Sequence, residues 1–342
     1  MVKKLSMALA LLGLVPLLGL TPQALLADEP AQRAPAASTN RQAVEMTPED
    51  VGAWLDGLMP YALADGDIPG AVVTVVKDGK VLANKGYGYA DLAKRKPVDP
   101  DTTLFRIGSI SKLFTWTAVM QQVEAGRLDL DTDVNEYLDF EIPPYEGKPI
   151  TLRQIMTHTA GFEESVRHLI SSDPDDLLPL DEYVREALPA RVFAPGTTPA
   201  YSNYATALAG YIVERVSGTP YHSYIEGKIF RPLGMSYASA RQPLPDRLKP
   251  FASGGYQKMF GASEPFEIVI PEPAGSFSVS GADMAKFMIA HLEDGGPLLK
   301  PETAKQMHDY RAPGLGPLNT MALGFYEQRI NGRRSISHGG DT

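Results

Sequence analysis

Ser109 and Lys112 are the two residues whose types and spacing most directly suggest covalent chemistry. On a helix, residues three positions apart lie on the same face, so the Lys112 amine could approach the Ser109 hydroxyl and accept its proton. An apolar run follows from Leu113 to Val123 and ends at Gly126, which predicts a buried helix that begins at Ser109. The serine would then lie where the free N–H groups of a helix start converge. The pair therefore predicts a nucleophile with its own base.

A tyrosine, an asparagine and a histidine form two further candidate motifs. Tyr201-Ser202-Asn203 is the only Tyr-x-Asn sequence in the chain. Near the C-terminus, Ser337-His338-Gly339-Gly340 follows a predicted strand, where two glycines would let a substrate approach the backbone closely. The chain contains no Walker-type loop, no His-Glu-x-x-His pair and no Gly-x-Ser-x-Gly sequence. These absences argue against nucleotide hydrolysis, that class of zinc protease and the usual α/β-hydrolase.

Predicted strands at both ends of the chain enclose a mainly helical middle. Asp78-Gly79 and Asn331-Gly332 favour tight turns and predict two hairpins. The strands predicted around these turns are residues 71–77 with 81–89 and residues 321–330 with 333–338. A helix is expected after Thr47, and helical signals dominate residues 110–265. These signals include a capping box at Thr151-x-x-Gln154 and a helix from Asn203 to Val216 that ends at Gly218. We therefore expect an α/β (α+β) domain over residues 47–342. One lobe would be formed by residues 47–109 and 266–342, and a helical lobe inserted between them by residues 110–265. A cleft is expected between the two lobes.

The first residues have the features of a secretory signal peptide. Lys3 and Lys4 precede an apolar run, and Ala27 is a small residue before the predicted cleavage point, so residues 1–27 are assigned to the signal. The apolar run is too short to span a bilayer comfortably, so no stable membrane span is expected after cleavage. Residues 28–46 are rich in Ala and Pro and are expected to be a linker. The protein is therefore expected in the periplasm or outside the cell.

Composition limits the remaining function classes. The 342 residues include no cysteine, which excludes disulfides and thiolate zinc sites. Removal of the signal would leave 30 basic against 41 acidic residues, a net charge of −11 that would repel nucleic acid. Asp129, Asp131 and Asp133 imitate the start of a calcium loop, but Val134 occupies the position of the required glycine. Neither a metal ion nor another cofactor is predicted.

Three motifs in this order resemble the serine β-lactamase and penicillin-binding protein superfamily, specifically its class C β-lactamase-like branch. That branch also holds esterases, D-aminopeptidases and D-Ala-D-Ala carboxypeptidases. The likeness extends over residues 47–342 and also rests on Pro69-Gly70-Ala71, Leu104-Phe105-Arg106-Ile107-Gly108, His158-Thr159-Ala160-Gly161-Phe162 and Arg231-Pro232-Leu233-Gly234-Met235. It implies a β-lactamase-like fold, in which helices flank an antiparallel sheet and an all-helical lobe is inserted. Within these motifs, His158 is expected to order the backbone rather than to perform chemistry.

The resemblance also implies roles for individual residues. Ser109 would attack a carbonyl carbon and form an acyl-enzyme, which water then hydrolyses. Lys112 and Tyr201 would share the general-base work, and the sequence leaves open whether a tyrosine phenolate or a neutral lysine amine takes the proton. Asn203 would orient Lys112 and bind the substrate. The backbone N–H groups of Ser109 and Asp341 would form the oxyanion hole.

The third motif departs from the pattern of this branch. His338-Gly339-Gly340 is expected to bind substrate, but β-lactamases of the branch typically have Lys-Thr-Gly there. An imidazole that is neutral near pH 7 attracts a substrate carboxylate less than an ammonium does. We therefore expect a small ester or amide as substrate, with a β-lactam or a peptidoglycan-derived D-Ala-D-Ala peptide as the alternative. Relatives continue beyond the position of Thr342, so C-terminal truncation is expected, and a ligand-binding protein without turnover is a third alternative.

Overall fold

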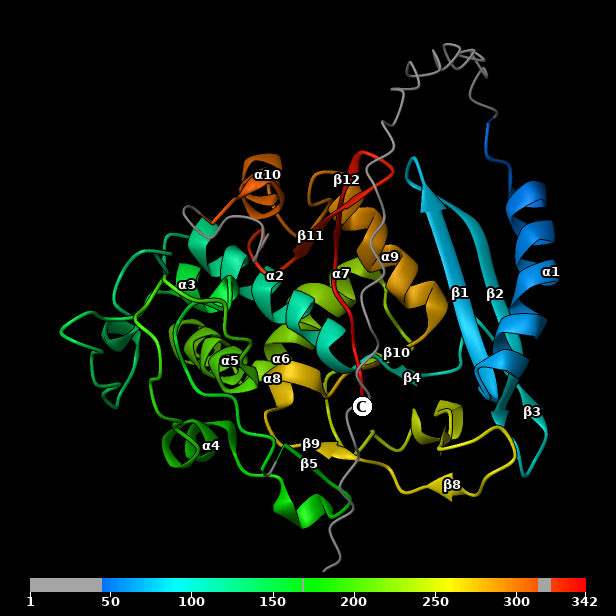
Figure 1. Cartoon of the computed structure of the whole chain (residues 1–342), viewed down its shortest axis with the longest axis horizontal. Coiled ribbons are helices and arrows are strands. Elements are labelled where there is room, and N and C mark those ends of the chain that lie inside the picture. The colour runs from blue at the N-terminus through cyan, green and yellow to red at the C-terminus, as the bar shows by residue number, and fades with distance from the viewer. Residues whose placement is uncertain (1–44, 168, 313–320) are drawn as a thin grey trace, which may run out of the picture. The chain divides into compact units, whose positions relative to one another are not determined.

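The computed structural model describes residues 45–167, 169–312 and 321–342. The predicted signal peptide, residues 1–27, and residues 28–44 of the predicted linker lie outside the described residues. The chain divides into the units Met1–Glu45 and Met46–Thr342, and the second unit carries every helix and strand described below (Figure 1).

This unit contains both α-helices and β-strands. The α-helices are α1 (Pro48–Asp65), α2 (Ser111–Glu124), α3 (Leu152–Met156), α4 (Leu180–Glu186), α5 (Asn203–Ser217), α6 (Tyr221–Ile225), α7 (Arg231–Leu233), α8 (Glu272–Gly275), α9 (Gly281–Leu292) and α10 (Pro301–Asp309). The strands are β1 (Gly70–Lys77), β2 (Lys80–Asp91), β3 (Lys96–Pro97), β4 (Phe105–Arg106), β5 (Ile170–Ser171), β6 (Ala238–Ser239), β7 (Gly255–Tyr256), β8 (Ser263–Glu264), β9 (Ile268–Val269), β10 (Ser278–Val279), β11 (Tyr326–Ile330) and β12 (Arg333–Ser337). In the described part of the chain, every helix is too short or too polar to cross a membrane.

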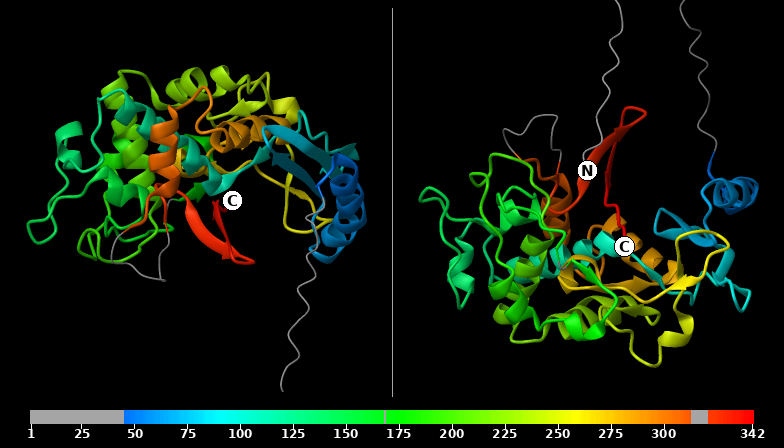
Figure 2. Two further views of the ribbon diagram at one scale, coloured as in Figure 1. Left: turned by 90° about the horizontal axis from the view of Figure 1, so that it is seen from above. Right: turned by 60° about the horizontal axis from the view of Figure 1, so that its bottom comes forward.

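Strands β1, β2 and β3 form an antiparallel sheet with a helix against each face. Val73 of β1 packs with Val51 and Leu55 of α1 on one face. Adjacent residues of a strand point to opposite faces. On the other face the start of α9 is so close that a Cβ at Gly281 would come within 2.5 Å of Val72. Figure 1 and Figure 2 show α1, β1 and β2 at one end of this unit and α3, α4 and α5 toward the other.

Helix α2 lies at the centre of the mainly helical part of the unit. Eleven of its fourteen residues are buried, among them Phe114 and Trp116 at 0% exposure. Helix α5 packs against α2, and the short helix α8 contacts both. A Cβ at Gly210 of α5 would come within 2.5 Å of Pro273 of α8, which shows how closely these two backbones approach. This arrangement brings the starts of α2 and α5 together with the end of α8.

Several predicted elements are present with their expected ends. Thr47 caps α1 by accepting a hydrogen bond from the N–H of Asp50, and Ser202 caps α5 in the same way. Asp78 and Gly79, like Asn331 and Gly332, have the positive φ angles that tight hairpin turns require. These predictions depend on short-range interactions.

The C-terminal hairpin differs from the expectation in two respects. Its first strand begins at Tyr326 rather than at residue 321. In the described residues, β11 pairs with β12 and with no other strand, so the two ends of the chain form separate sheets. The middle of the chain is mainly helical, as expected, but it also contains short strand pairs such as β5 with β9.

Candidate active site

The serine of the first motif lies in a short 3-10 turn, Gly108–Ile110, which precedes α2. The sequence predicted that the helix itself begins at Ser109, whereas α2 begins two residues later. Gly108 has a φ of +49°, and a Cβ there would lie 2.6 Å from the backbone nitrogen of Asp341. Glycine is therefore required at this position both for its conformation and for its close approach to the C-terminal segment.

Lys112 is fully buried and faces three oxygen atoms. Its Nζ lies 3.0 Å from Ser109 Oγ, 2.7 Å from Asn203 Oδ1 and 2.8 Å from the backbone oxygen of Ala274. Burial lowers the pKa of Lys112 to about 7, and the negative charge of Glu164 acts in the opposite direction. Near neutral pH, a substantial fraction of this amine is therefore uncharged.

Tyr201 lies beside this amine. The centre of its ring is 4.7 Å from Lys112 Nζ. Burial raises the pKa of Tyr201 above its ordinary range, although a hydrogen bond with Ser109 opposes this shift. The phenol is therefore protonated near pH 7.

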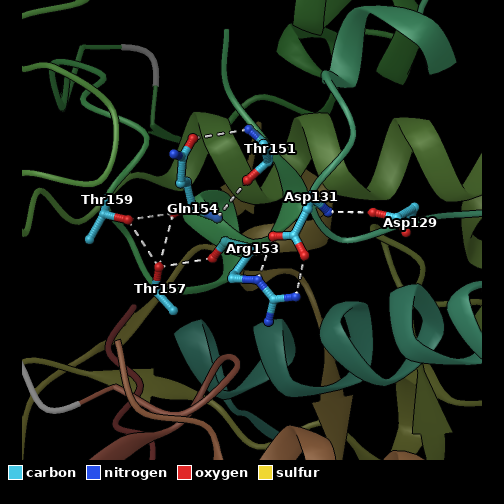
Figure 3. Close-up of polar contacts among 7 residues, drawn as sticks. All are labelled: Asp129, Asp131, Thr151, Arg153, Gln154, Thr157 and Thr159. Atoms are coloured by element: carbon cyan, nitrogen blue, oxygen red, sulfur yellow. Dashed lines mark hydrogen bonds and ion pairs between the residues drawn. The ribbon is translucent and has the colours of Figure 1, made fainter. Parts of the chain in front are cut away.

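Local hydrogen bonds among Thr151, Gln154, Thr157 and Thr159 hold α3 and the residues that follow it (Figure 3). His158 lies between the last two of these residues. Thr151 and Gln154 form the predicted capping box: the Thr151 hydroxyl accepts from the Gln154 N–H, and Gln154 Oε1 accepts from the Thr151 N–H. The backbone oxygen of Gln154 then accepts a hydrogen bond of 2.7 Å from the N–H of Thr159. The chain reverses there, with His158 at a φ of +54°.

His158 holds the backbone on both sides of Tyr201. Its carbonyl oxygen accepts from the N–H of Ala200 at 2.7 Å, and its Nδ1 accepts from the N–H of Ser202 at 3.4 Å. The rings of His158 and Tyr201 lie 4.4 Å apart, centre to centre. Burial, with the nearby Lys112, lowers the pKa of His158 far below its usual value, so Nδ1 remains an acceptor. His158 therefore orders the backbone, as the sequence predicted.

Asn203 is held by a carboxylate that sequence reasoning missed. Glu164 Oε2 accepts from the backbone N–H of Asn203 at 2.9 Å, and Oε1 accepts from Asn203 Nδ2 at 2.8 Å. The only sequence signal is its position, two residues after the His-Thr-Ala-Gly-Phe motif. Nothing in that spacing indicates a partner 39 residues away.

The C-terminal segment runs past the start of α2. His338 follows β12, and its ring centre is 5.3 Å from that of Tyr326. Burial lowers the pKa of His338 to about 4, so the imidazole is neutral at pH 7. Gly340 packs against Ile107, where a Cβ would overlap the backbone oxygen. From the sequence, Gly340 was expected to let a substrate approach the backbone closely. In the structure, it is the chain's own backbone at Ile107 that requires this glycine.

The site is adjacent to a cavity of about 600 Å³. Glu164 and Asn203 form part of its wall, but Ser109 and Lys112 do not. Its described lining also includes the acidic residues Glu163, Asp175, Asp176 and Glu186, together with the basic residue Arg167. The cavity is therefore predominantly acidic next to the reactive groups.

The aspartates that imitate a calcium loop have structural roles. Asp131 accepts two hydrogen bonds of 2.6 Å from Arg153, and Asp129 accepts one from the N–H of Asp131 (Figure 3). Asp133 caps a turn by accepting from the N–H of Asn135. Within the described residues, no cluster of three or more His, Cys, Asp or Glu side chains could hold a metal ion.

A serine hydroxyl, a buried amine and a phenol in one cluster are typical of serine hydrolases that work through an acyl-enzyme. A family model described as Beta-lactamase matches residues 20–342, and the chain therefore belongs to the beta-lactamase family, whose members are serine hydrolases. The chain is 32% identical over 191 residues to protein flp of Staphylococcus aureus. That match covers 55% of this chain and only 38% of flp, so the chain accounts for less than half of that relative.

Solved structures agree with this assignment. The octameric penicillin-binding protein homologue from Pyrococcus abyssi matches with a TM-score of 0.71 and 28% identity, over 85% of this chain and 68% of that one. D-alanine carboxypeptidase AmpC from Burkholderia cenocepacia matches with a TM-score of 0.66 and 25% identity, over 83% of this chain and 76% of that one. The predicted family and the β-lactamase-like fold are thus confirmed.

Proposed function

We propose that this protein hydrolyses an ester or amide through an acyl-enzyme on Ser109, with the neutral amine of Lys112 as the general base. One observation carries the proposal: Lys112 Nζ has two neighbours, Asn203 Oδ1 and the Ala274 oxygen, that can only accept hydrogen bonds. A neutral amine has two hydrogens and one lone pair. With both hydrogens donated to these oxygens, the lone pair is left for the Ser109 hydroxyl at 3.0 Å.

The proposed reaction begins when Ser109 Oγ attacks the substrate carbonyl carbon and its proton passes to Lys112 Nζ. The tetrahedral intermediate collapses, the bond to the leaving group breaks, and that group takes the proton from the lysine ammonium. Water then attacks the acyl-enzyme and gives a proton to Lys112, which returns it to Ser109 as the acid is released. Tyr201, protonated near pH 7, would serve as a hydrogen-bond donor and proton relay rather than as a phenolate.

The backbone N–H groups of Ser109 and Asp341 are the proposed oxyanion hole. Within residues 45–167, 169–312 and 321–342, neither N–H donates to another backbone group. Gly108 brings the Asp341 backbone close to the turn that carries the nucleophile. Both donors are thus available for the charge that develops on the carbonyl oxygen.

The proposed substrate class is a small ester or amide without a carboxylate near the scissile bond. His338 is neutral at pH 7, and Glu164 and the other acidic residues of the cavity would repel an anionic group. Because residues 1–27 have the features of a signal peptide, we place this activity in the periplasm or outside the cell. Fractionation of cells that produce the full chain tests this location.

Covalent labelling tests the nucleophile. A fluorophosphonate probe should label the wild type and not Ser109→Ala, and mass spectrometry should find the adduct on Ser109 rather than on its neighbour Ser111. A folded wild type that neither reacts with the probe nor hydrolyses short activated esters would refute the enzymatic proposal. Ligand-induced thermal stabilisation without product would then favour a binding protein.

Substrate comparison tests the class. Turnover of a neutral short-chain ester should exceed that of a cephalosporin and of a D-Ala-D-Ala peptide. Efficient cephalosporin turnover would instead support a β-lactamase, and efficient release of D-alanine would support a carboxypeptidase.

A further inference from the structure

We propose that Glu164 is a positioning residue of this active site, which fixes the Asn203 amide so that its oxygen, and not its nitrogen, faces Lys112. The inference rests on the proposed function, because it concerns how the proposed base is held. Glu164 does not touch the reacting atoms in this arrangement: it holds Asn203 through hydrogen bonds, and its charge acts on Lys112 from a distance.

The contacts of Glu164 select one orientation of the Asn203 amide. An ionised carboxylate can only accept hydrogen bonds, and Glu164 accepts one from Asn203 Nδ2 at 2.8 Å. In the opposite orientation, Asn203 Oδ1 would face this carboxylate and Nδ2 would face the lysine amine. The contact between Oδ1 and the carboxylate would then be unfavourable, and Nδ2 would compete with the Ser109 hydroxyl for the lone pair of the neutral amine. The carboxylate therefore leaves Oδ1 directed toward Lys112 Nζ at 2.7 Å.

A second hydrogen bond fixes the backbone of the same residue. Glu164 Oε2 accepts from the N–H of Asn203, the first residue of α5, at 2.9 Å. The first N–H groups of a helix have no partner within the helix, and a negative charge there is stabilising. The carboxylate therefore anchors both the backbone and the side chain of Asn203 at the start of α5.

The charge of Glu164 also acts on the proposed base. The groups that face Lys112 from the surrounding elements are Tyr201, His158, His338, Asn203 and the Ala274 carbonyl of α8, none of which carries a charge near pH 7. Within the described residues, it is the charge of Glu164 that raises the pKa of Lys112 against the effect of burial. Removing this charge should shift the pH at which the amine becomes neutral to a lower value.

Three variants separate the position of the carboxylate from its charge. Glu164→Gln keeps the length but loses the charge and one acceptor, and Glu164→Asp keeps the charge but shortens the reach. Glu163→Gln is the matched control, because Glu163 lines the same cavity and, in the part of the chain that the structure describes, makes no hydrogen bond with Asn203. The measurement is the rate of Ser109 labelling by a fluorophosphonate between pH 5 and pH 9, with thermal unfolding as a check on folding.

We expect Glu164→Gln to lower the labelling rate by about 10- to 100-fold and to move the acidic limb of the profile to lower pH. Glu164→Asp should lower the rate with the limb near its wild-type position, and it still tests positioning if Glu164→Gln does not fold. Glu163→Gln should have a much smaller effect than Glu164→Gln on both the rate and the limb. In an Asn203→Ala background, Glu164→Gln should add little to the loss of rate, because both changes break one chain of contacts.

The inference would be overturned by a wild-type rate and limb in folded Glu164→Gln, or by additive losses in the double variant. An equal effect of Glu163→Gln would show a general effect of cavity charge and would also overturn it. Failure of the proposed function is distinguishable, since the wild type itself would then not be labelled.

Discussion

The protonation state of Lys112 gives the sharpest test of how this site works. If the neutral amine is the base, the acylation rate should follow the fraction of Lys112 that is uncharged. With a pKa of about 7, this fraction is roughly a half at pH 7, about a tenth at pH 6 and about nine tenths at pH 8. An ordinary lysine would be neutral to only about 0.04% at pH 7.

The assay is the hydrolysis of a short activated ester under kcat/KM conditions between pH 5 and pH 9. We expect the rate to rise about tenfold per pH unit below pH 6 and to level off above pH 8. Lys112→Arg keeps a cation but has no lone pair at any of these pH values, so it should lose about 10²- to 10⁴-fold in rate. Circular dichroism over the same range separates titration from unfolding.

Two results would refute the reasoning. A profile that does not change between pH 5 and pH 8 would show that Lys112 does not titrate in this range. A limb that persists in Lys112→Arg but is lost in Tyr201→Phe would assign the proton to the phenol. Such a result would mean that the phenolate is stabilised despite the burial of Tyr201.

Three further predictions concern the surroundings of the site. Gly340→Ala should lower the labelling rate about 100-fold, because its Cβ would displace the segment that carries the proposed oxyanion donor. Gly339→Ala, whose Cβ meets no atom within 4 Å, should lower the labelling rate less. His158→Ala should slow labelling and lower the free energy of unfolding, measured in urea, by about 1–3 kcal/mol. The substitution removes the ring that packs on Tyr201 and the Nδ1 that accepts a hydrogen bond from the Ser202 N–H. Burial lowers the pKa of His291 to about 3 in the folded protein. When the pH falls, the unfolded chain therefore takes up a proton at this residue before the folded protein does, near the ordinary pKa of 6.5. The contribution of neutral His291 to the free energy of unfolding is then complete above pH 6.5 and should fall by roughly 1.4 kcal/mol per pH unit toward pH 3. Urea unfolding at pH 5 and pH 7 would detect this loss. Equal free energies of unfolding at the two pH values would contradict the prediction.

Features that depend on neighbouring residues could be predicted from the sequence. The cap at Thr47, the capping box at Thr151 and the turn at Asp78-Gly79 each need only a few adjacent residues, and each occurs where the pattern placed it. The proximity of Ser109 and Lys112 was predicted for the same reason, although the serine lies in a 3-10 turn and not in the helix.

Features that depend on tertiary contacts could not be predicted from local patterns, and the contact of Asn203 with Lys112 was expected only from the family resemblance. Trp54 fits the apolar spacing of α1, yet it is 64% exposed, because the face that meets the sheet is centred on Val51 and Leu55. The hairpin at the C-terminal end was predicted, but the sequence could not show that it forms a sheet of its own. A short-range pattern specifies a turn and its two strands, whereas the neighbours of those strands depend on the rest of the fold.

Glu164 shows why the site residues recognised by motif are not the whole site. Burial alone would drive the pKa of Lys112 lower, because a desolvated ammonium is disfavoured, and the Glu164 charge works against this effect. A base is most effective when its pKa lies near the working pH, so the balance between these two influences matters more than either group alone. The motif residues contain the proposed reacting atoms, but the pKa of the proposed base depends on how deeply the fold buries Lys112 and on a carboxylate from a separate loop. The same carboxylate makes the neighbouring cavity more acidic. One residue outside the motifs thus connects the working pH of the proposed base with the charge of the substrates that can approach it.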